Sequence, residues 1–117
     1  MYRIAKEWTF SAAHHLPSLP AGHKCRRPHG HNYRVQLVLA ADALDEHGLV
    51  VDYGQMDDLG AYLAGRFDHR DLNEVFGAAA TAENLARHLY DFAMTMWPQT
   101  LLVRVAESDG TWAEYGG

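Results

Sequence analysis

HGHNYRVQLVLAAD, residues 29–42, alternates between two kinds of side chain with a period of two. One parity becomes apolar after two histidines: His29, His31, Tyr33, Val35, Leu37 and Leu39. The other parity is polar at Asn32, Arg34 and Gln36. This pattern predicts a β-strand with one buried face. The segment DEHG, residues 45–48, predicts a turn after the strand.

The beginning of the chain, YRIAKEWTFSAAH (residues 2–14), predicts another strand by the same argument. Its apolar parity is interrupted only by Lys6 and ends on His14. The segment between the two strands, residues 15–28, contains three prolines and a glycine and is predicted to be a loop.

Two later segments have a helical period. In residues 50–67, apolar side chains recur at spacings of three and four: Met56, Leu59, Leu63 and Phe67. Asp52 is the expected cap, with Gln55 three residues later as in a capping box, although Gly60 and Gly65 disfavour a helix.

The other helix is predicted over residues 81–97, with Thr81 as its cap and an end before Pro98. Its apolar stripe consists of Leu85, Leu89, Phe92 and Met96. The segment FDHRDLN, residues 67–73, is predicted to be an irregular connection between the two helices.

The last segment, residues 100–115, predicts a hairpin with its turn at Asp109-Gly110. Its first strand carries one parity of Leu101, Val103, Val105 and Glu107. The element order is therefore β-β-α-α-β-β, which predicts an α+β fold, a four-stranded antiparallel sheet with two helices on one face. No repeat or linker divides the chain, and we expect a single domain over residues 1–117.

Composition excludes several classes of protein. The net charge is -5 in 117 residues, so general nucleic-acid binding is not expected, although Lys24, Arg26 and Arg27 form a local basic patch or a solvated loop. One cysteine cannot form an internal disulfide, which favours a cytoplasmic protein. The first residues lack a signal peptide, and no apolar stretch could span a membrane. A chain this short leaves much surface exposed, which association would relieve.

Histidine is the unusual component, with eight in the chain and five between His14 and His31. Each of three predicted strands has a polar side chain where its apolar face ends: His14, the pair His29 and His31, and Glu107. In a strand, residues i and i+2 point to the same face about 6–7 Å apart. His29 and His31 can therefore share a metal, with His14 as a third ligand of a catalytic zinc ion. The alternative is a surface H-x-H without metal.

Cys25 allows three interpretations: a fourth zinc ligand, a nucleophile or base beside the metal, or an inert buried thiol. The neighbouring basic residues argue against the inert thiol, because an electropositive setting favours thiolate.

Two acidic positions are also candidates for function. Asp68 and His69 can form an acid–base unit, in which Asp71 could orient the histidine instead, or they are only a polar helix exit. Glu107 would pair with an arginine or with a ligand that presents two N–H donors.

Five motifs in order resemble the 6-pyruvoyl-tetrahydropterin synthase superfamily: FSAAHHLP, GHKCRRPHGHNY, FDHRDLN, TAENLA and VAES. The C-x-x-x-H-x-H spacing from Cys25 to His31 most resembles the queuosine-pathway branch, the 6-carboxy-tetrahydropterin synthases. The resemblance runs from about Trp8 to Tyr115 and implies the tunnelling fold (T-fold). In this fold sheets of several subunits join into a barrel, so it implies a homo-oligomer, with a hexamer favoured, and active sites between subunits.

The resemblance also implies roles for individual residues. His14 rather than His15 matches a zinc ligand, together with His29 and His31. The other implied residues are the catalytic Cys25, Asp68 and His69, the pterin-anchoring Glu107, and Glu83 near the substrate.

The implied reaction converts 7,8-dihydroneopterin triphosphate to 6-carboxy-5,6,7,8-tetrahydropterin, acetaldehyde and triphosphate. The basic residues near Cys25 are candidates for holding the triphosphate. The alternatives are a pyruvoyl-tetrahydropterin synthase, an enzyme that cleaves the pterin side chain, and a non-catalytic zinc-stabilised binding module.

Overall fold

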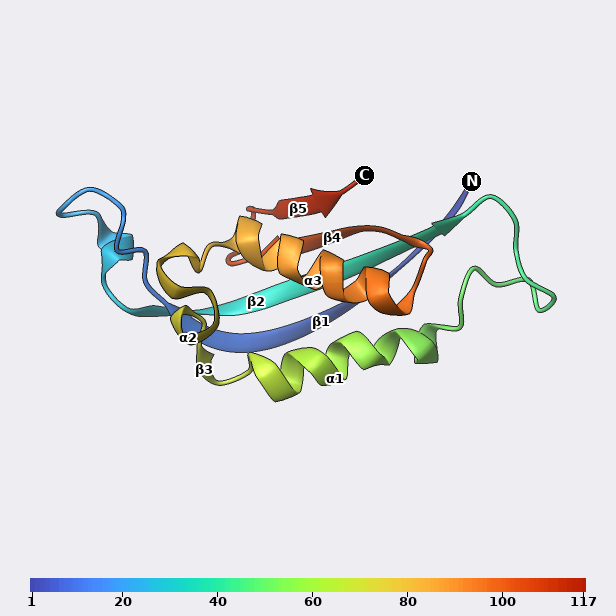
Figure 1. Cartoon of the computed structure of the whole chain (residues 1–117), viewed down its shortest axis with the longest axis horizontal. Coiled ribbons are helices and arrows are strands. Elements are labelled where there is room, and N and C mark those ends of the chain that lie inside the picture. Colours follow the sequence, from blue (N-terminus) through green and yellow to red (C-terminus); the bar gives the residue numbers. More distant parts are fainter.

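The computed structural model describes all residues from 1 to 117. Two long strands, β1 (Tyr2–His14) and β2 (His29–Ala41), pair antiparallel over their whole length. They form the middle of a five-stranded sheet with the order β3-β1-β2-β4-β5, shown in Figure 1. The two strands have the bounds that the period-two pattern predicts, except that β2 ends one residue earlier, at Ala41.

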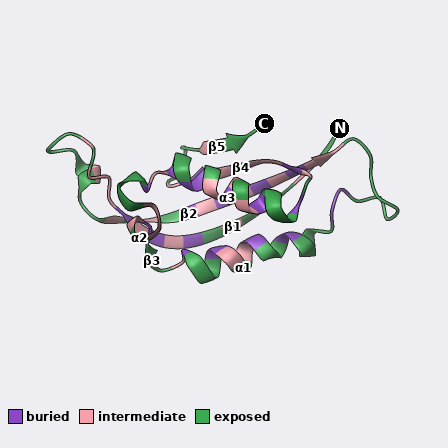
Figure 2. Ribbon diagram, viewed as in Figure 1, coloured by how far each residue is buried: buried purple, intermediate pink, exposed green.

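The register explains why the alternation is so clear in the sequence. His14 lies opposite His29, Phe10 lies opposite Tyr33 and Ile4 lies opposite Leu39, so the apolar parities of both strands share one face. The helices α1 (Asp57–Arg66) and α3 (Ala82–Met96) cover this face. Figure 2 shows the resulting alternation of buried and exposed segments along β1 and β2.

Helix α1 begins later than expected, because the 3-10 helix η2 (Tyr53–Met56) precedes it. Asp52 accepts a hydrogen bond from the backbone N–H of Gly54 and therefore caps η2, so the predicted capping box with Gln55 is wrong. Gly60 has a packing reason to be in α1: a Cβ there would lie 2.5 Å from Nε1 of Trp8. The predicted stripe from Met56 to Phe67 is buried.

Helix α3 has the predicted cap and end. The side chain of Thr81 accepts a hydrogen bond from Asn84 N–H, and the helix stops at Met96, two residues before Pro98. Met96 is 40% exposed, so its predicted place in the buried stripe is wrong. The stripe passes through Ala93 instead, which is fully buried.

The predicted irregular connection contains a short strand, β3 (Arg70–Asp71), which pairs parallel to Ala12 and Ala13 of β1. The sheet is therefore mixed and five-stranded, and the expected four-stranded antiparallel sheet describes only its longer strands. Two residues are too few to show an alternation in the sequence. A short helix α2 (Asn73–Phe76) and the 3-10 helix η3 (Gly77–Ala79) lead to α3.

The hairpin at the end of the chain consists of β4 (Thr100–Ala106) and β5 (Ala113–Gly116). Gly110 has a φ of 90° in the connecting turn, a conformation that favours glycine. The predicted turn lies there, and the α+β fold is confirmed with two main helices on one face of the sheet.

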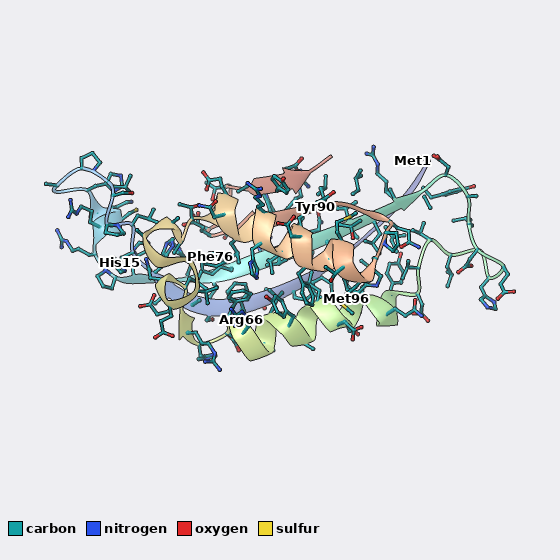
Figure 3. All side chains as sticks on the ribbon, in the orientation of Figure 1. Met1, His15, Arg66, Phe76, Tyr90 and Met96 are labelled. Atoms are coloured by element: carbon teal, nitrogen blue, oxygen red, sulfur yellow. The ribbon has the colours of Figure 1, made fainter.

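The chain is elongated, with extents of 55 × 25 × 24 Å. Met1 lies at one end of the long axis and His15 lies toward the other, as labelled in Figure 3. The loop after His15 carries the 3-10 helix η1 (Lys24–Arg26) and extends beyond the sheet. No helix of the chain has both the length and the apolar character needed to cross a membrane.

Candidate metal centre and active site

Three histidines meet where β1 ends and β2 begins. His14 and His29 are direct cross-strand partners, and His31 lies two residues further along β2 on the same face. One ligand atom from each can be chosen so that all three lie within 4.8 Å of one another. The three side chains therefore form a group that could bind a metal ion. His15 belongs to no such group, as the parity of β1 predicts.

Backbone carbonyls orient two of these rings. Nδ1 of His14 lies 2.6 Å from the carbonyl oxygen of Ala80, and Nδ1 of His29 lies 2.7 Å from that of Arg27. A carbonyl can only accept, so each Nδ1 carries a proton, and in the neutral ring the lone pair lies on Nε2. Metal-binding histidines in proteins characteristically donate their other ring N–H in this way.

Glu107 follows β4 and directs its carboxylate at the histidine cluster. Its Oε2 lies 3.2 Å from Nε2 of His31 and 3.7 Å from Nε2 of His14. Neither contact is a hydrogen bond, since both Nε2 atoms are buried without a hydrogen-bond partner. Burial lowers the pKa of His31. The negative charge of Glu107 raises this pKa in part, and His14 and His29 lower it further. A neutral imidazole is the form that binds metal.

Asp68 and His69 are held near the C-terminal end of β1. The carboxylate of Asp68 accepts a hydrogen bond from Ser11 N–H at 3.0 Å and lies 3.0 Å from Nδ1 of His69. The Ser11 bond and, next, the His69 contact lower the pKa of Asp68. His69 has a φ of 59° and an exposed side chain. The contact is compatible with an acid–base unit and with a polar helix exit alike.

A hollow of about 540 Å³ is lined by His69 and by His31, but Asp68, His14 and His29 are not among its lining residues. The remaining lining residues come from β1, β2 and β3: Ser11, Ala12, Ala13, Gly30, Asn32, Arg70 and Asp71. The hollow thus has in its lining His31 and His69, which are 38 residues apart in the sequence.

Cys25 lies in η1, in the loop beyond the sheet, with a partly exposed side chain. Its carbonyl accepts a hydrogen bond from Leu16 N–H at 2.7 Å, and its N–H donates to Nδ1 of His23 at 3.1 Å. His23 is therefore the cap of η1, a role that the sequence did not suggest. Cys25 is not among the residues that line the hollow beside His69.

Glu83 and Glu107 line a second hollow of about 230 Å³. Trp112, which the sequence left without a role, also lines it. Arg34 and Arg104 lie 4.8 and 5.6 Å from the centre of the Trp112 ring, which holds the β4–β5 turn against the sheet.

A sheet of mainly antiparallel strands with two main helices on one face and a histidine cluster at the end of its two central strands is the arrangement expected of the T-fold class. The chain belongs to the 6-pyruvoyl tetrahydropterin synthase family, whose model matches residues 3–117. The family resemblance read from the five motifs is therefore confirmed.

Named relatives refine this assignment. A protein of Archaeoglobus fulgidus, provisionally named 6-carboxy-5,6,7,8-tetrahydropterin synthase, is 33% identical over 106 residues, which are 91% of this chain and 88% of that protein. The 6-carboxy-5,6,7,8-tetrahydropterin synthase of Bacillus subtilis is 35% identical over 97 residues, which are 77% of this chain and 64% of that protein. The expectation of a synthase-like enzyme is confirmed at this level.

The fold has a close counterpart among solved structures. The 6-pyruvoyl tetrahydropterin synthase of Caenorhabditis elegans superposes with a TM-score of 0.86, covering 99% of this chain and 95% of that one. The two sequences are 24% identical, so this likeness establishes the T-fold alone.

Proposed function

We propose that the chain converts 7,8-dihydroneopterin triphosphate and water to 6-carboxy-5,6,7,8-tetrahydropterin, acetaldehyde and triphosphate. The observation that carries the proposal is the cluster of His14, His29 and His31 with a carboxylate, Glu107, directed at it. The names of the relatives and the C-x-x-x-H-x-H spacing favour the carboxy-forming branch of the family. The product would then enter 7-deazapurine biosynthesis, the queuosine pathway.

Zinc is the metal that fits this donor set best. Three imidazoles with one further position are typical of catalytic zinc, whereas magnesium and calcium prefer oxygen ligands. The Nδ1 bonds of His14 and His29 hold both rings in the tautomer that a metal needs. When bound, zinc would polarise the substrate oxygens and make the neighbouring protons more acidic.

Glu107 and Glu83 are the proposed contacts for the pterin ring. The hollow of about 230 Å³ that they line suits a flat bicyclic ligand. A carboxylate can accept two parallel N–H bonds, which is the pattern that the 2-amino and ring N–H edge of a pterin presents. Glu107 would then hold the ring with its side chain directed at His31.

Cys25, Asp68 and His69 are the proposed groups for proton transfer. Asp68 orients the exposed His69 ring, so that its Nε2 can take and return a proton. Cys25 lies in a loop that extends away from the sheet, and we infer that it meets His69 of another subunit. A homo-oligomer, with a hexamer favoured, would bring the two groups together across an interface.

The experiment is product analysis. The purified protein is incubated with 7,8-dihydroneopterin triphosphate and zinc, and the products are identified by mass. We expect acetaldehyde and the carboxy-pterin in equal amounts. A pyruvoyl product would assign the chain to the other branch of the family, and unchanged substrate would favour a binding module.

A further inference from the structure

Tyr33 has a buried hydroxyl group that none of the proposed roles uses. We propose that Tyr33 is a positioning residue, whose hydroxyl donates a hydrogen bond to the oxygen ligand that completes the site among His14, His29 and His31. This inference rests on the proposed metal site. It adds a group outside the histidine ligands that selects which small ligand can lie beside the ion.

The first observation concerns unsatisfied polar atoms. Three buried side-chain atoms have no hydrogen-bond partner: Nε2 of His14, Nε2 of His31 and the hydroxyl of Tyr33. A buried polar atom without a partner costs free energy, and native proteins keep few of them. The rings of these three side chains contact one another, so the three atoms belong to one cluster in the folded chain.

The second observation is that the Tyr33 ring is fixed. It stacks on Phe10 with 5.0 Å between the ring centres and an angle of 9°. The rings of His31 and His14 approach it edge-on, at 5.5 and 6.0 Å. Tyr33 follows His29 and His31 on the same face of β2, so the strand itself holds the Tyr33 ring beside the cluster.

The third observation concerns which hydrogen-bond roles remain open. The Nε2 of His14, whose Nδ1 faces a carbonyl, and the carboxylate of Glu107 are acceptors or metal ligands. Among the groups at the cluster, the phenol of Tyr33 is an unused donor. A water or hydroxyl oxygen beside the metal would donate to Glu107 and accept from Tyr33. A phenylalanine would fill the same space without the cost of the buried hydroxyl.

The test compares Tyr33→Phe with the wild-type protein and with Tyr62→Phe as a matched control. The hydroxyl of Tyr62 already bonds Nε2 of His88 at 2.7 Å, between the two main helices. Each metal-free protein is melted to obtain its Tm and is then titrated with Co²⁺. The visible absorption of Co²⁺ reports both its affinity and its ligand geometry.

For Tyr33→Phe we expect a metal-free Tm equal to or above that of the wild-type protein. We also expect Co²⁺ binding that is about tenfold weaker, the lower end for loss of an outer-shell partner, and an altered absorption band. For Tyr62→Phe we expect a lower Tm and an unchanged Co²⁺ titration.

Two results would overturn the inference: Co²⁺ affinity and spectrum identical to those of the wild-type protein, or a fall in the metal-free Tm as large as in Tyr62→Phe with normal Co²⁺ binding. The latter would mean that the hydroxyl has only a structural partner. Failure of the wild-type protein to bind Co²⁺ would instead refute the metal site itself.

Discussion

His14 is buried and His88 is partly buried, and the chain satisfies their ring nitrogens differently. His88 packs against Phe67 and Phe76 between α1 and α3, and its Nε2 bonds the hydroxyl of Tyr62. His14 is 1% exposed, and its Nδ1 bonds a carbonyl while its Nε2 has no partner. The Nε2 of His88 is thus used within the fold, whereas the Nε2 of His14 is left available for a ligand.

The largest expected effect is a difference in turnover between a variant of the histidine cluster and a variant of His88. His31→Ala removes a proposed metal ligand, and since metal catalysis supplies several kcal/mol, activity should fall more than about 100-fold. His88→Gln should keep most of the activity, because Gln can still bond Tyr62. Initial rates of product formation at saturating zinc provide the measurement. Equal losses in the two variants would remove the distinction between the sites.

The substitution Cys25→Ala tests whether the thiol in the loop after β1 transfers protons or binds zinc. If the thiol transfers protons, turnover should fall about 10²–10⁴-fold while the zinc content stays unchanged. A thiol that completes a closed zinc site would instead lose the metal together with stability. Rates and elemental analysis on the same sample decide between the two, and full activity with full zinc would refute the catalytic role.

Metal addition should stabilise only a protein with the intact cluster. Free zinc at about 100 times its Kd raises the free energy of unfolding by about 2.7 kcal/mol. The Tm should therefore rise for the wild-type protein and for His88→Gln, and stay unchanged for His31→Ala. A chelator should reverse the rise. A zinc-dependent Tm in His31→Ala would locate the metal elsewhere.

The smallest effect is on acid stability at the helix pair. Burial lowers the pKa of His88 and Arg66 lowers it further, against Asp91, so the folded value lies below the unfolded value of 6.5. The unfolded chain then binds more protons, and the free energy of unfolding falls as the pH falls from about 7 through the folded pKa. Metal-free His88→Gln should lose less Tm between pH 7.5 and 5.5 than the wild-type protein. An identical loss would show that His88 does not contribute.

The sequence predicts β1 and β2 well because one of their faces is buried along the whole length. The alternation in β1 ends at His14 and the alternation in β2 starts at His29, and both result from the burial of that face. The sequence does not reveal β3, whose two residues are held by pairing with Ala12 and Ala13. The sequence pattern also places the start of α1 too early. The side chain of Asp52 accepts a hydrogen bond from the N–H of Gly54 and so caps the preceding 3-10 helix η2.

The histidine cluster could be predicted for the same reason, because parity and strand pairing place polar residues at a common end. Glu107 joins them as the residue after β4. The cap role of His23 and the hollow lined by Trp112 depend on loop conformations that no period describes. The unpaired hydroxyl of Tyr33 could not be predicted from the sequence, because the pattern places Tyr33 among the apolar residues of β2.

The most direct test of the central claim is the metal content of the purified chain and its variants. We expect one zinc per chain in the wild-type protein, in Cys25→Ala and in His88→Gln, and none in His31→Ala. Zinc retained in His31→Ala, or lost in Cys25→Ala, would contradict a metal site made by His14, His29 and His31.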